Sequence, residues 1–356
     1  MNWEQYKNNF IQKNKIHKKF DENELSLKLN YAYNLYENNL PILYNVDHLS
    51  KVMGINKEYL YKVSNSNFKY FYRTFYLPKK NGGTRRIDTP LPNLKLAQKW
   101  IYDNILLKLE TSIYCKSYKP NFSIKDNAKF HRNQNLVLKL DIKNFFKNIR
   151  HKDIYLLFKE IGYNNDICNL LTKLVILNDD TKIKKIGIAQ GAITSPSISN
   201  LILKGFDNKI AEYCKQSKIR YTRYADDLTF SGDFNPNNII NFVEKNLNKQ
   251  GFVLNKNKIK KIYKNESQIV TGIVVNEKLQ VSRQYRKNIR LEIYHLLNHT
   301  KEHLNKKEVT NYFEQREYIL ALMSKINFVL SINKNDKKMI EYKNKLYKLL
   351  RSLDRM

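Results

Sequence analysis

The stretch Tyr221-Thr222-Arg223-Tyr224-Ala225-Asp226-Asp227-Leu228-Thr229-Phe230-Ser231-Gly232 places two adjacent acids between apolar and aromatic flanks. Strands favour β-branched and aromatic residues, whereas Asp is depleted in strands and favoured in turns. We therefore expect a β-hairpin over 219–230 with Asp226 and Asp227 at its tip. Two neighbouring carboxylates repel each other unless a cation neutralises them. For the dipeptide alone, however, an exposed acidic turn is the simpler interpretation.

A third acid precedes this hairpin in the chain. Leu136-Val137-Leu138-Lys139-Leu140-Asp141 is typical of a buried strand that ends in a carboxylate. Taken alone, Asp141 fits the N-cap of a helix. Taken with Asp226 and Asp227, it predicts a cluster of carboxylate oxygens, which hard cations such as Mg²⁺ prefer. Three acids around two ions about 4 Å apart suit phosphoryl transfer.

The composition favours a polyanionic partner. The chain has 356 residues, with 64 Lys and Arg against 33 Asp and Glu, and a formal charge of +31. The basic residues are spread along nearly the whole length, and nucleic acid is the commonest partner of such a field. A Lys- and Asn-rich genome, or a surface that faces anionic lipid, would leave the same composition. The 25 Tyr residues suit stacking on single-stranded bases, although packing is the simpler role of any single ring.

The three cysteines and the hydropathy pattern indicate the compartment. Cys115, Cys168 and Cys214 have no C-x-x-C spacing and no nearby His at ligand distance, which argues against a zinc site or a disulfide framework. The N-terminus has no apolar signal core, and no apolar run approaches membrane-spanning length. We therefore expect a cytoplasmic protein without a membrane partner.

The first part of the chain predicts helices followed by a hairpin. Residues 1–68 are basic and Asn-rich and lack strand-like alternation, so we expect a helical extension. Within it, residues 46–60 have the outline of a helix, a Gly-containing turn and a second helix, which a packed pair shares with a helix-turn-helix DNA-binding motif. Strands over 71–77 and 85–88 are expected to pair, because Asn81-Gly82-Gly83 supplies positive-φ residues for a tight turn.

The rest of the chain mixes strands with helices and then becomes wholly helical. We expect helices over 94–109, 152–160 and 165–177, a turn and helix over 190–203, and a strand over 269–275. Apolar stripes at helical spacing predict three more amphipathic helices, over 283–298, 308–330 and 336–353. This irregular order favours an α+β class over a regular doubly wound sheet.

Four segments resemble, in order, those of bacterial reverse transcriptases. They are the fingers hairpin at Pro78–Ile87, the first catalytic aspartate segment at Leu140–Phe146, the Gln-Gly-x-x-x-Ser-Pro block at Gln190–Pro196, and Tyr-Ala-Asp-Asp within Arg223–Gly232. The resemblance runs from about residue 70 to 276 and implies a right-hand polymerase fold. Its parts would be an N-terminal helical extension (1–68), fingers and palm (69–276) and an all-helical thumb (277–356).

The resemblance also implies roles for individual residues in the reaction. Asp141, Asp226 and Asp227 would be the catalytic residues and would bind two Mg²⁺ ions. Lys79 and Arg85 would form a cationic clamp on the incoming triphosphate.

Further roles concern the nucleotide. Phe146 would be a steric gate that selects deoxynucleotides, because its ring lies where a ribose 2′-hydroxyl would otherwise sit. Gln190 and Gly191 would line the nucleotide and template pocket. Lys258 would protonate the departing pyrophosphate, a role for which Lys256 is the alternative.

Two further segments resemble elements of the retron reverse transcriptases. Asn127-Ala128-Lys129-Phe130-His131 fits their Asn-Ala-x-x-His element, and Val270-Thr271-Gly272 fits their Val-Thr-Gly element. The resemblance implies RNA or DNA binding by Asn127, His131, Val270, Thr271 and Gly272. For His131, a structural role that holds the backbone is the other interpretation.

A retron-type enzyme would use dNTPs to copy a structured non-coding RNA into single-stranded DNA. The family implies priming from an RNA 2′-hydroxyl, a branched RNA–DNA hybrid (msDNA) that the protein keeps, and anti-phage defence with a separately encoded effector protein. One alternative is another bacterial reverse transcriptase, either group II intron-like or of another defence type. A second is a non-catalytic nucleic-acid-binding regulator that uses residues 46–60.

Overall fold

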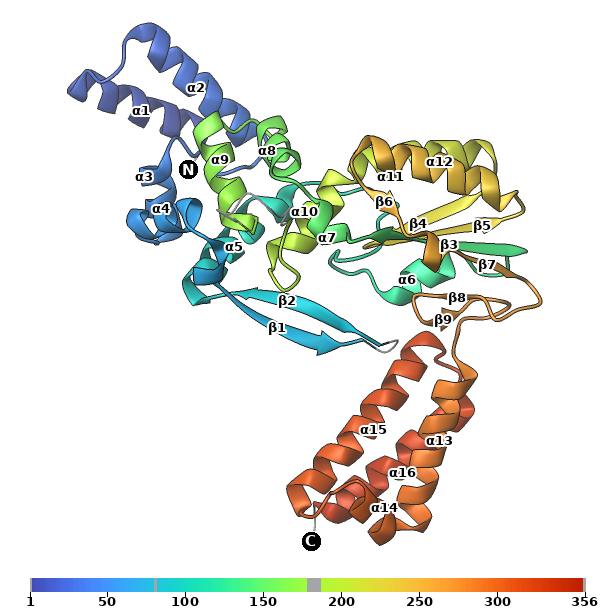
Figure 1. Cartoon of the computed structure of the whole chain (residues 1–356). Coiled ribbons are helices and arrows are strands. Elements are labelled where there is room, and N and C mark those ends of the chain that lie inside the picture. The colour runs from blue at the N-terminus through green and yellow to red at the C-terminus, as the bar shows by residue number, and fades with distance from the viewer. Residues whose placement is uncertain (1, 80–81, 178–186, 355–356) are drawn as a thin grey trace. The chain divides into compact units, whose positions relative to one another are not determined.

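The computed structural model describes residues 2–79, 82–177 and 187–354 (Figure 1). The chain forms two compact units, each assembled from several stretches. The first unit comprises Met1–Tyr118, Ile142–Ile210 and Phe242–Leu254, and the second comprises Lys119–Asp141, Ala211–Asn241 and Asn255–Met356. Helices and antiparallel sheets occur together, which confirms the α+β class. The division at residues 68 and 276 stays a prediction, since the two units interleave along the chain.

Four helices open the first unit, as predicted for residues 1–68. They are α1 (Trp3–His17), α2 (Glu22–Glu37), α3 (Val46–Met53) and α4 (Lys57–Asn65). Each follows an Asn or Asp whose side chain accepts a backbone N–H of the first turn, so the Asn-rich composition supplies helix caps. Gly54 ends α3 with φ +65°, which confirms the helix–turn–helix outline.

The predicted hairpin of the first unit consists of β1 (Tyr72–Pro78) and β2 (Thr84–Pro90), which pair antiparallel with Leu77 opposite Arg85. Gly82 and Gly83 have φ of +82° and +75°, conformations that glycine adopts without a steric penalty. Asn81, the other predicted turn residue, lies outside the described residues.

Four more helices of the first unit lie close to their predicted positions, and other helices form where none was predicted. The helix expected over 94–109 is α5 (Pro92–Asn104), which begins with proline in its first turn and is followed by a 3₁₀ turn (Leu106–Lys108). The helices expected over 152–160, 165–177 and 190–203 are α8 (His151–Glu160), α9 (Asn165–Val175) and α10 (Thr194–Ile202). The short helix α7 (Phe145–Asn148) was not predicted, and neither were α11 (Lys204–Gln216) and α12 (Pro236–Lys249), whose residues are divided between the two units.

An antiparallel sheet organises the second unit around β3 (Leu136–Lys143). One edge of β3 pairs with β5 (Asp227–Gly232), which in turn pairs with β4 (Arg220–Tyr224). The other edge pairs with β7 (Lys260–Tyr263). The last two residues of β3 belong to the first unit and pair there with β6 (Val253–Leu254). Strand β3 therefore has neighbours on both edges, and its side chains are buried on both faces except at Lys139 and Lys143, which agrees with its nearly continuous apolar run. The strand continues two residues beyond Asp141, where the sequence predicts its end.

The strand predicted over 269–275 is wrong in detail, because the segment forms a hairpin. Strands β8 (Ile269–Val270) and β9 (Ile273–Val274) pair across a turn at Thr271 and Gly272, whose φ values are +47° and +84°. A third strand, β10 (Gln280–Val281), pairs with β9. The apolar run hides this turn, since Gly272 is its single sequence signal.

Helices alone follow β10 among the described residues, as predicted for the C-terminus. They are α13 (Arg283–Asn298), α14 (Thr300–Lys306), α15 (Tyr312–Ile332) and α16 (Lys337–Leu353). Helix α14 was not predicted, and α15 begins later than residue 308 because Asn311 and Glu314 form a capping box there. Their apolar faces share one buried core with Ala128, Val137 and Val270. No helix among the described residues is long and apolar enough to cross a membrane.

Candidate active site

The predicted carboxylate hairpin is present, with a two-residue loop. Tyr224 and Asp227 are the last cross-strand pair of β4 and β5, so Ala225 and Asp226 form the loop. Ala225 is buried and has φ +56°, a left-handed conformation that costs a non-glycine residue about 1–3 kcal/mol. The buried guanidinium of Arg223 donates to the carbonyl of Ala225 over 3.1 Å. The strained turn is thus held from within the protein.

The register of β3 and β5 brings the third acid to this turn. Asp141 lies directly opposite Asp227, and the next pair on the same face is Lys139 with Thr229. On the other face, Leu140 faces Leu228 and Leu138 faces Phe230, and all four side chains are fully buried. Since a slip of one residue would move these apolar side chains to the wrong face, their burial holds two like charges opposite each other.

The electrostatics of the turn reflect this crowding. Burial raises the pKa of Asp226 to about 6, and the charges of Asp227 and Asp141 act in the same direction. Burial also raises the pKa of Asp227, against the lowering effect of Lys139. The structure thus brings together the three acids that the sequence singles out, in surroundings that disfavour the ionisation of Asp226 and Asp227.

One of the three acids is already compensated by neighbouring side chains. Lys258 Nζ lies 2.7 Å from Asp141 Oδ2, and Asn255 Nδ2 donates to Asp141 Oδ1 over 3.0 Å. The backbone N–H of Asn255 also donates to the carbonyl of Asp141 over 2.8 Å. The bond to Asp141 raises the pKa of Lys258. The structure therefore brings Lys258 to the acids, and it adds Asn255, whose only sequence signal is its place three residues before that lysine.

The donor chemistry of the site fits a hard divalent cation. Among the described residues, no three acidic, His or Cys side chains are arranged as a ready ligand set. Both carboxylate oxygens of Asp141 are engaged by Asn255 and Lys258. Asp226 and Asp227 have no ion-pair partner in the part of the chain that the structure describes, and burial raises the pKa of both more than the nearby lysines lower it. A cation could be held by these two acids directly, and by Asp141 once Lys258 releases it.

The predicted nucleotide-binding residues, apart from Lys258, belong to the first unit. Lys79 and Arg85 are exposed at the β1–β2 hairpin. The backbone carbonyl of Gln190 accepts the N–H of Asp88 over 2.9 Å. Gly191 has φ +133°, and an added Cβ there would lie 2.9 Å from the Asp88 carbonyl. The Gln190-Gly191 segment therefore packs on β2, and its contact with a nucleotide stays a prediction.

A glycine that the sequence did not single out supports Phe146. The half-buried Phe146 lies in α7, and its backbone carbonyl accepts the N–H of Ile188 over 3.0 Å. A Cβ on the neighbouring Gly187 would lie 2.1 Å from that carbonyl oxygen and 2.7 Å from Lys147 Cα. The two backbones can approach this closely only because residue 187 has no side chain.

The five predicted RNA-binding residues belong to the second unit, and three of them are buried in its interior. Asn127, His131 and Val270 are fully buried, so direct contact of their side chains with nucleic acid does not fit this structure. Thr271 is half-buried and donates to the carbonyl of Ile124 over 3.1 Å, whereas Gly272 is exposed. Of the five residues, only Thr271 and Gly272 are accessible, and their contact with RNA stays a prediction.

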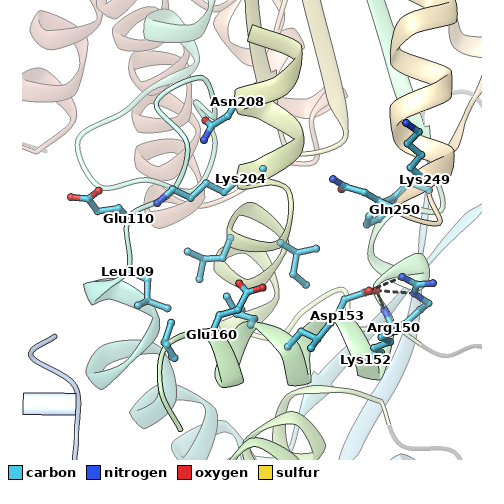
Figure 2. A pocket seen from close by; sticks show the side chains of 17 residues that line it. Leu109, Glu110, Arg150, Lys152, Asp153, Glu160, Lys204, Asn208, Lys249 and Gln250 are labelled. Atoms are coloured by element: carbon cyan, nitrogen blue, oxygen red, sulfur yellow. Dashed lines mark hydrogen bonds and ion pairs between the residues drawn. The ribbon is translucent and has the colours of Figure 1, made fainter. Parts of the chain in front are cut away.

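The first unit also contains a hollow of about 770 Å³ (Figure 2). Its lining includes residues of α8, the end of α10, the start of α11 and the end of α12. At its rim, Arg150 and Asp153 form an ion pair of 2.7 Å. None of the predicted catalytic or nucleotide-binding residues lines it.

The chain is similar in sequence to proteins of a known family. The model of the reverse transcriptase (RNA-dependent DNA polymerase) family matches residues 77–303. The retron Ec86 reverse transcriptase of Escherichia coli is 29% identical over 87% of this chain and 91% of its own. The retron Ec83 reverse transcriptase of the same organism is 34% identical over 61% of this chain and 73% of its own.

Other matches are more partial. The retron Mx65 reverse transcriptase of Myxococcus xanthus is 31% identical over 63% of this chain, which spans 55% of that protein's length. Among solved structures, a telomerase from Candida albicans covers 80% of this chain and 66% of its own, at 10% identity and a TM-score of 0.43.

The raised pKa of Asp226 predicts how Asp226→Asn changes stability with pH. The folded protein binds this proton more tightly than the unfolded chain does, so the stability that the group contributes is present below about pH 4 and is lost as pH rises through about 6. Without divalent cations, Asp226→Asn should therefore stabilise the protein at pH 8 by on the order of 2 kcal/mol. The gain should vanish near pH 4 when both proteins are unfolded in urea. The exposed Asp233→Asn is the matched control, and a gain independent of pH would contradict this reasoning.

The ion pair between Lys258 and Asp141 predicts competition between the lysine and a metal ion. Lys258→Met removes a positive charge from the acids and frees an oxygen of Asp141, so Mn²⁺ should bind about tenfold more tightly, as followed by electron paramagnetic resonance. Lys256→Met makes the same change in charge two residues away and should alter the affinity less than twofold (about 0.4 kcal/mol). Unchanged or weaker binding to the Lys258→Met variant would refute the competition.

The contact of Gly187 predicts a costly substitution. Gly187→Ala forces the backbone of Phe146 and Lys147 to shift, so the free energy of unfolding should fall by about 2–3 kcal/mol. Chemical denaturation measures this change. The control is Gly205→Ala in α11, where an added Cβ meets no atom within 4 Å, and which should be neutral or slightly stabilising. Equal effects of the two substitutions would show that the close approach is unimportant.

Proposed function

This chain belongs to the reverse transcriptase (RNA-dependent DNA polymerase) family and is of the retron type, and we propose that it copies an RNA template into DNA at the Asp141–Asp226–Asp227 cluster. The observation that carries this proposal is the cross-strand register that sets Asp141 against Asp227 beside the Ala225–Asp226 loop. Acids crowded in this way, two of them without an ion-pair partner among the described residues, suit a site for divalent cations and phosphate.

Two Mg²⁺ ions are the proposed cofactors, with the three aspartates as protein ligands. When bound, such ions lower the pKa of an attacking hydroxyl and neutralise the charge on the triphosphate. The chain's own contribution is to hold three oxygen-bearing groups in a fixed register. Asn255 keeps Asp141 oriented through its side chain and its backbone N–H.

Lys258 is the proposed source of the proton that leaves with the pyrophosphate. Like any lysine, Lys258 is protonated at neutral pH, and its bond to Asp141, which raises its pKa further, holds Nζ beside the acid cluster. Once a cation takes its place on Asp141, Nζ is released and can donate to a phosphate oxygen.

The residues proposed to bind the nucleotide are Lys79, Arg85, Phe146, Gln190 and Gly191. The two exposed cations suit a triphosphate, and the ring of Phe146 suits a steric gate against a 2′-hydroxyl. Gln190 and Gly191 contribute through the backbone, which packs on β2. The C-terminal helices α13–α16 would hold the template–product duplex, and the turn at the half-buried Thr271 and the exposed Gly272 would contact RNA.

The proposed template is a structured non-coding RNA, primed from one of its own 2′-hydroxyls. The product would be msDNA, a branched RNA–DNA hybrid that stays bound to the protein. We further propose a role in anti-phage defence together with a separately encoded effector protein. Support for these finer points comes from the retron names of the relatives and from the Asn-Ala-x-x-His and Val-Thr-Gly elements.

Asp226→Asn tests the proposed function. The purified variant should fold, yet its incorporation of dTTP on poly(rA) primed with oligo(dT) should fall at least about 1,000-fold, because an amide is a poor ligand for Mg²⁺. Asp233→Asn should retain wild-type activity. DNA synthesis by the Asp226→Asn variant at the wild-type rate would overturn the assignment.

Nucleic acid that copurifies with the protein tests the retron proposal separately. A short DNA that survives RNase and shortens after debranching would support it. Bound RNA without DNA would oppose it and leave a reverse transcriptase of another kind.

A further inference from the structure

The buried Asn-Ala-x-x-His element makes hydrogen bonds to both strands of the carboxylate hairpin. Helix α6 (Ile124–Lys129) carries Asn127, and His131 follows two residues after its end. His131 Nε2 lies 2.7 Å from Thr222 Oγ1 on β4, and His131 Nδ1 lies 2.7 Å from Ser231 Oγ on β5. Thr222 Oγ1 donates in turn to Asn127 Oδ1 over 2.6 Å. One imidazole ring therefore ties the two strands together.

The direction of each hydrogen bond follows from proton counting. The hydroxyl of Thr222 has one proton and donates it to Asn127, so it can only accept from His131 Nε2–H. Burial lowers the pKa of His131 to about 3, so the ring is neutral and carries a single N–H. Nδ1 is then an acceptor, and Ser231 donates to it. The chain of bonds runs from Ser231 through His131 and Thr222 to Asn127, with each proton used once.

The two bonded residues of the hairpin are not cross-strand partners. Thr222 lies opposite Thr229, whereas Ser231 lies opposite Arg220. The ring of His131 thus spans a diagonal of the ribbon, and a slide of one strand along the other would break one of its two bonds. Thr222 is two residues before Tyr224, the last residue of β4, so this diagonal fixes the register close to the acids.

The composition of the network argues against a role in packing alone. Asn127 is fully buried, and its Nδ2 has no hydrogen-bond partner among the described residues. A buried donor without a partner destabilises the folded state, and an apolar residue would avoid that cost. What Asn127 supplies in return is the acceptor that orients the hydroxyl of Thr222. Buried networks of this kind favour one arrangement over its alternatives.

Helix α6 is itself anchored on several sides. Thr271 donates to the carbonyl of Ile124, and Lys125 Nζ lies 2.7 Å from the carbonyl of Ser331 at the end of α15. Ala128 and Val270 belong to the core that the C-terminal helices share. The Val-Thr-Gly turn therefore supports α6, and α6 presents a fixed surface to the hairpin.

We propose that Asn127, His131 and Thr222 are positioning residues, which fix the register of β4 and β5 and thereby hold Asp226 and Asp227 in place for polymerisation. This inference rests on the proposed function. It replaces RNA contact, which the sequence implies for Asn127 and His131, with a task inside the protein. Template choice then has no part in their action, so they are needed for copying any template.

A generic template–primer separates these two roles. Poly(rA) primed with oligo(dT) has none of the folded structure that RNA-recognition residues would read. With Mg²⁺ and dTTP, Thr222→Val, which removes both bonds of the hydroxyl at constant volume, should lower kcat about 10- to 100-fold. The KM for dTTP should change less than about threefold (0.65 kcal/mol). The same limit should hold for the affinity for a labelled template–primer, measured by fluorescence anisotropy. Thr222→Ser keeps the hydroxyl and should restore most of kcat.

Thr172→Val is the matched control. Thr172 is a fully buried residue of α9 whose hydroxyl has no hydrogen-bond partner among the described residues, so the same substitution should leave kcat unchanged. Amide hydrogen exchange in 220–232 should accelerate in Thr222→Val and not in Thr172→Val. If Thr222→Val does not fold, Ser231→Ala, which removes a single bond, decides by the same measurements.

The outcomes distinguish the inference from the function on which it rests. A wild-type chain that extends no primer overturns the proposed function, and the inference with it. An active wild type together with a folded Thr222→Val (or Ser231→Ala) variant of unchanged kcat overturns the inference alone. Loss of template–primer affinity at unchanged kcat would also overturn it, because that pattern belongs to nucleic-acid contact.

Discussion

Three carboxylates that repel one another lie together at the β4–β5 turn, and the packing of the second unit has to hold them there. Asp141 and Asp227 lie opposite each other, and Asp226 occupies the loop beside them. The arrangement persists because the other face of the same strand pair buries Leu138, Leu140, Leu228 and Phe230. Burial of each large apolar side chain contributes about 1.5–3 kcal/mol, which favours this register despite the repulsion between the acids. The apolar face thus holds the acids in a register that they would not adopt by themselves.

The negative charges of the three aspartates are not compensated equally by neighbouring side chains. Lys258 and Asn255 both bind the carboxylate of Asp141. For Asp226, burial raises the pKa more than any neighbouring charge changes it. A structural acid cluster would be expected to pair each carboxylate with a cation. Here the two acids of the turn have no ion-pair partner among the described residues, and a divalent ion would supply the positive charge that they lack.

Close backbone approaches have a comparable role in the first unit. Gly187 allows the chain to pass against the carbonyl of Phe146, and Gly191 allows it to pass against that of Asp88. Residues predicted to contact a nucleotide are thereby held by backbone contacts. Such contacts leave little trace in the sequence, because glycine is common in turns that have no functional role.

Local patterns predicted most of the elements. The alternation around Asp226 and Asp227, the caps of α1–α4 and the stripes of α13, α15 and α16 depend on residues close together in the chain, so the sequence by itself determined them. Only the tertiary structure decided that Asn127 and His131 face Thr222 and Ser231, that Lys258 reaches Asp141, and that 269–275 turns back at Gly272. Each of these results joins segments that are distant in the chain or opposes a strong local signal. Hydrogen bonds and close packing of that kind depend on the three-dimensional register of the strands, which no local pattern encodes.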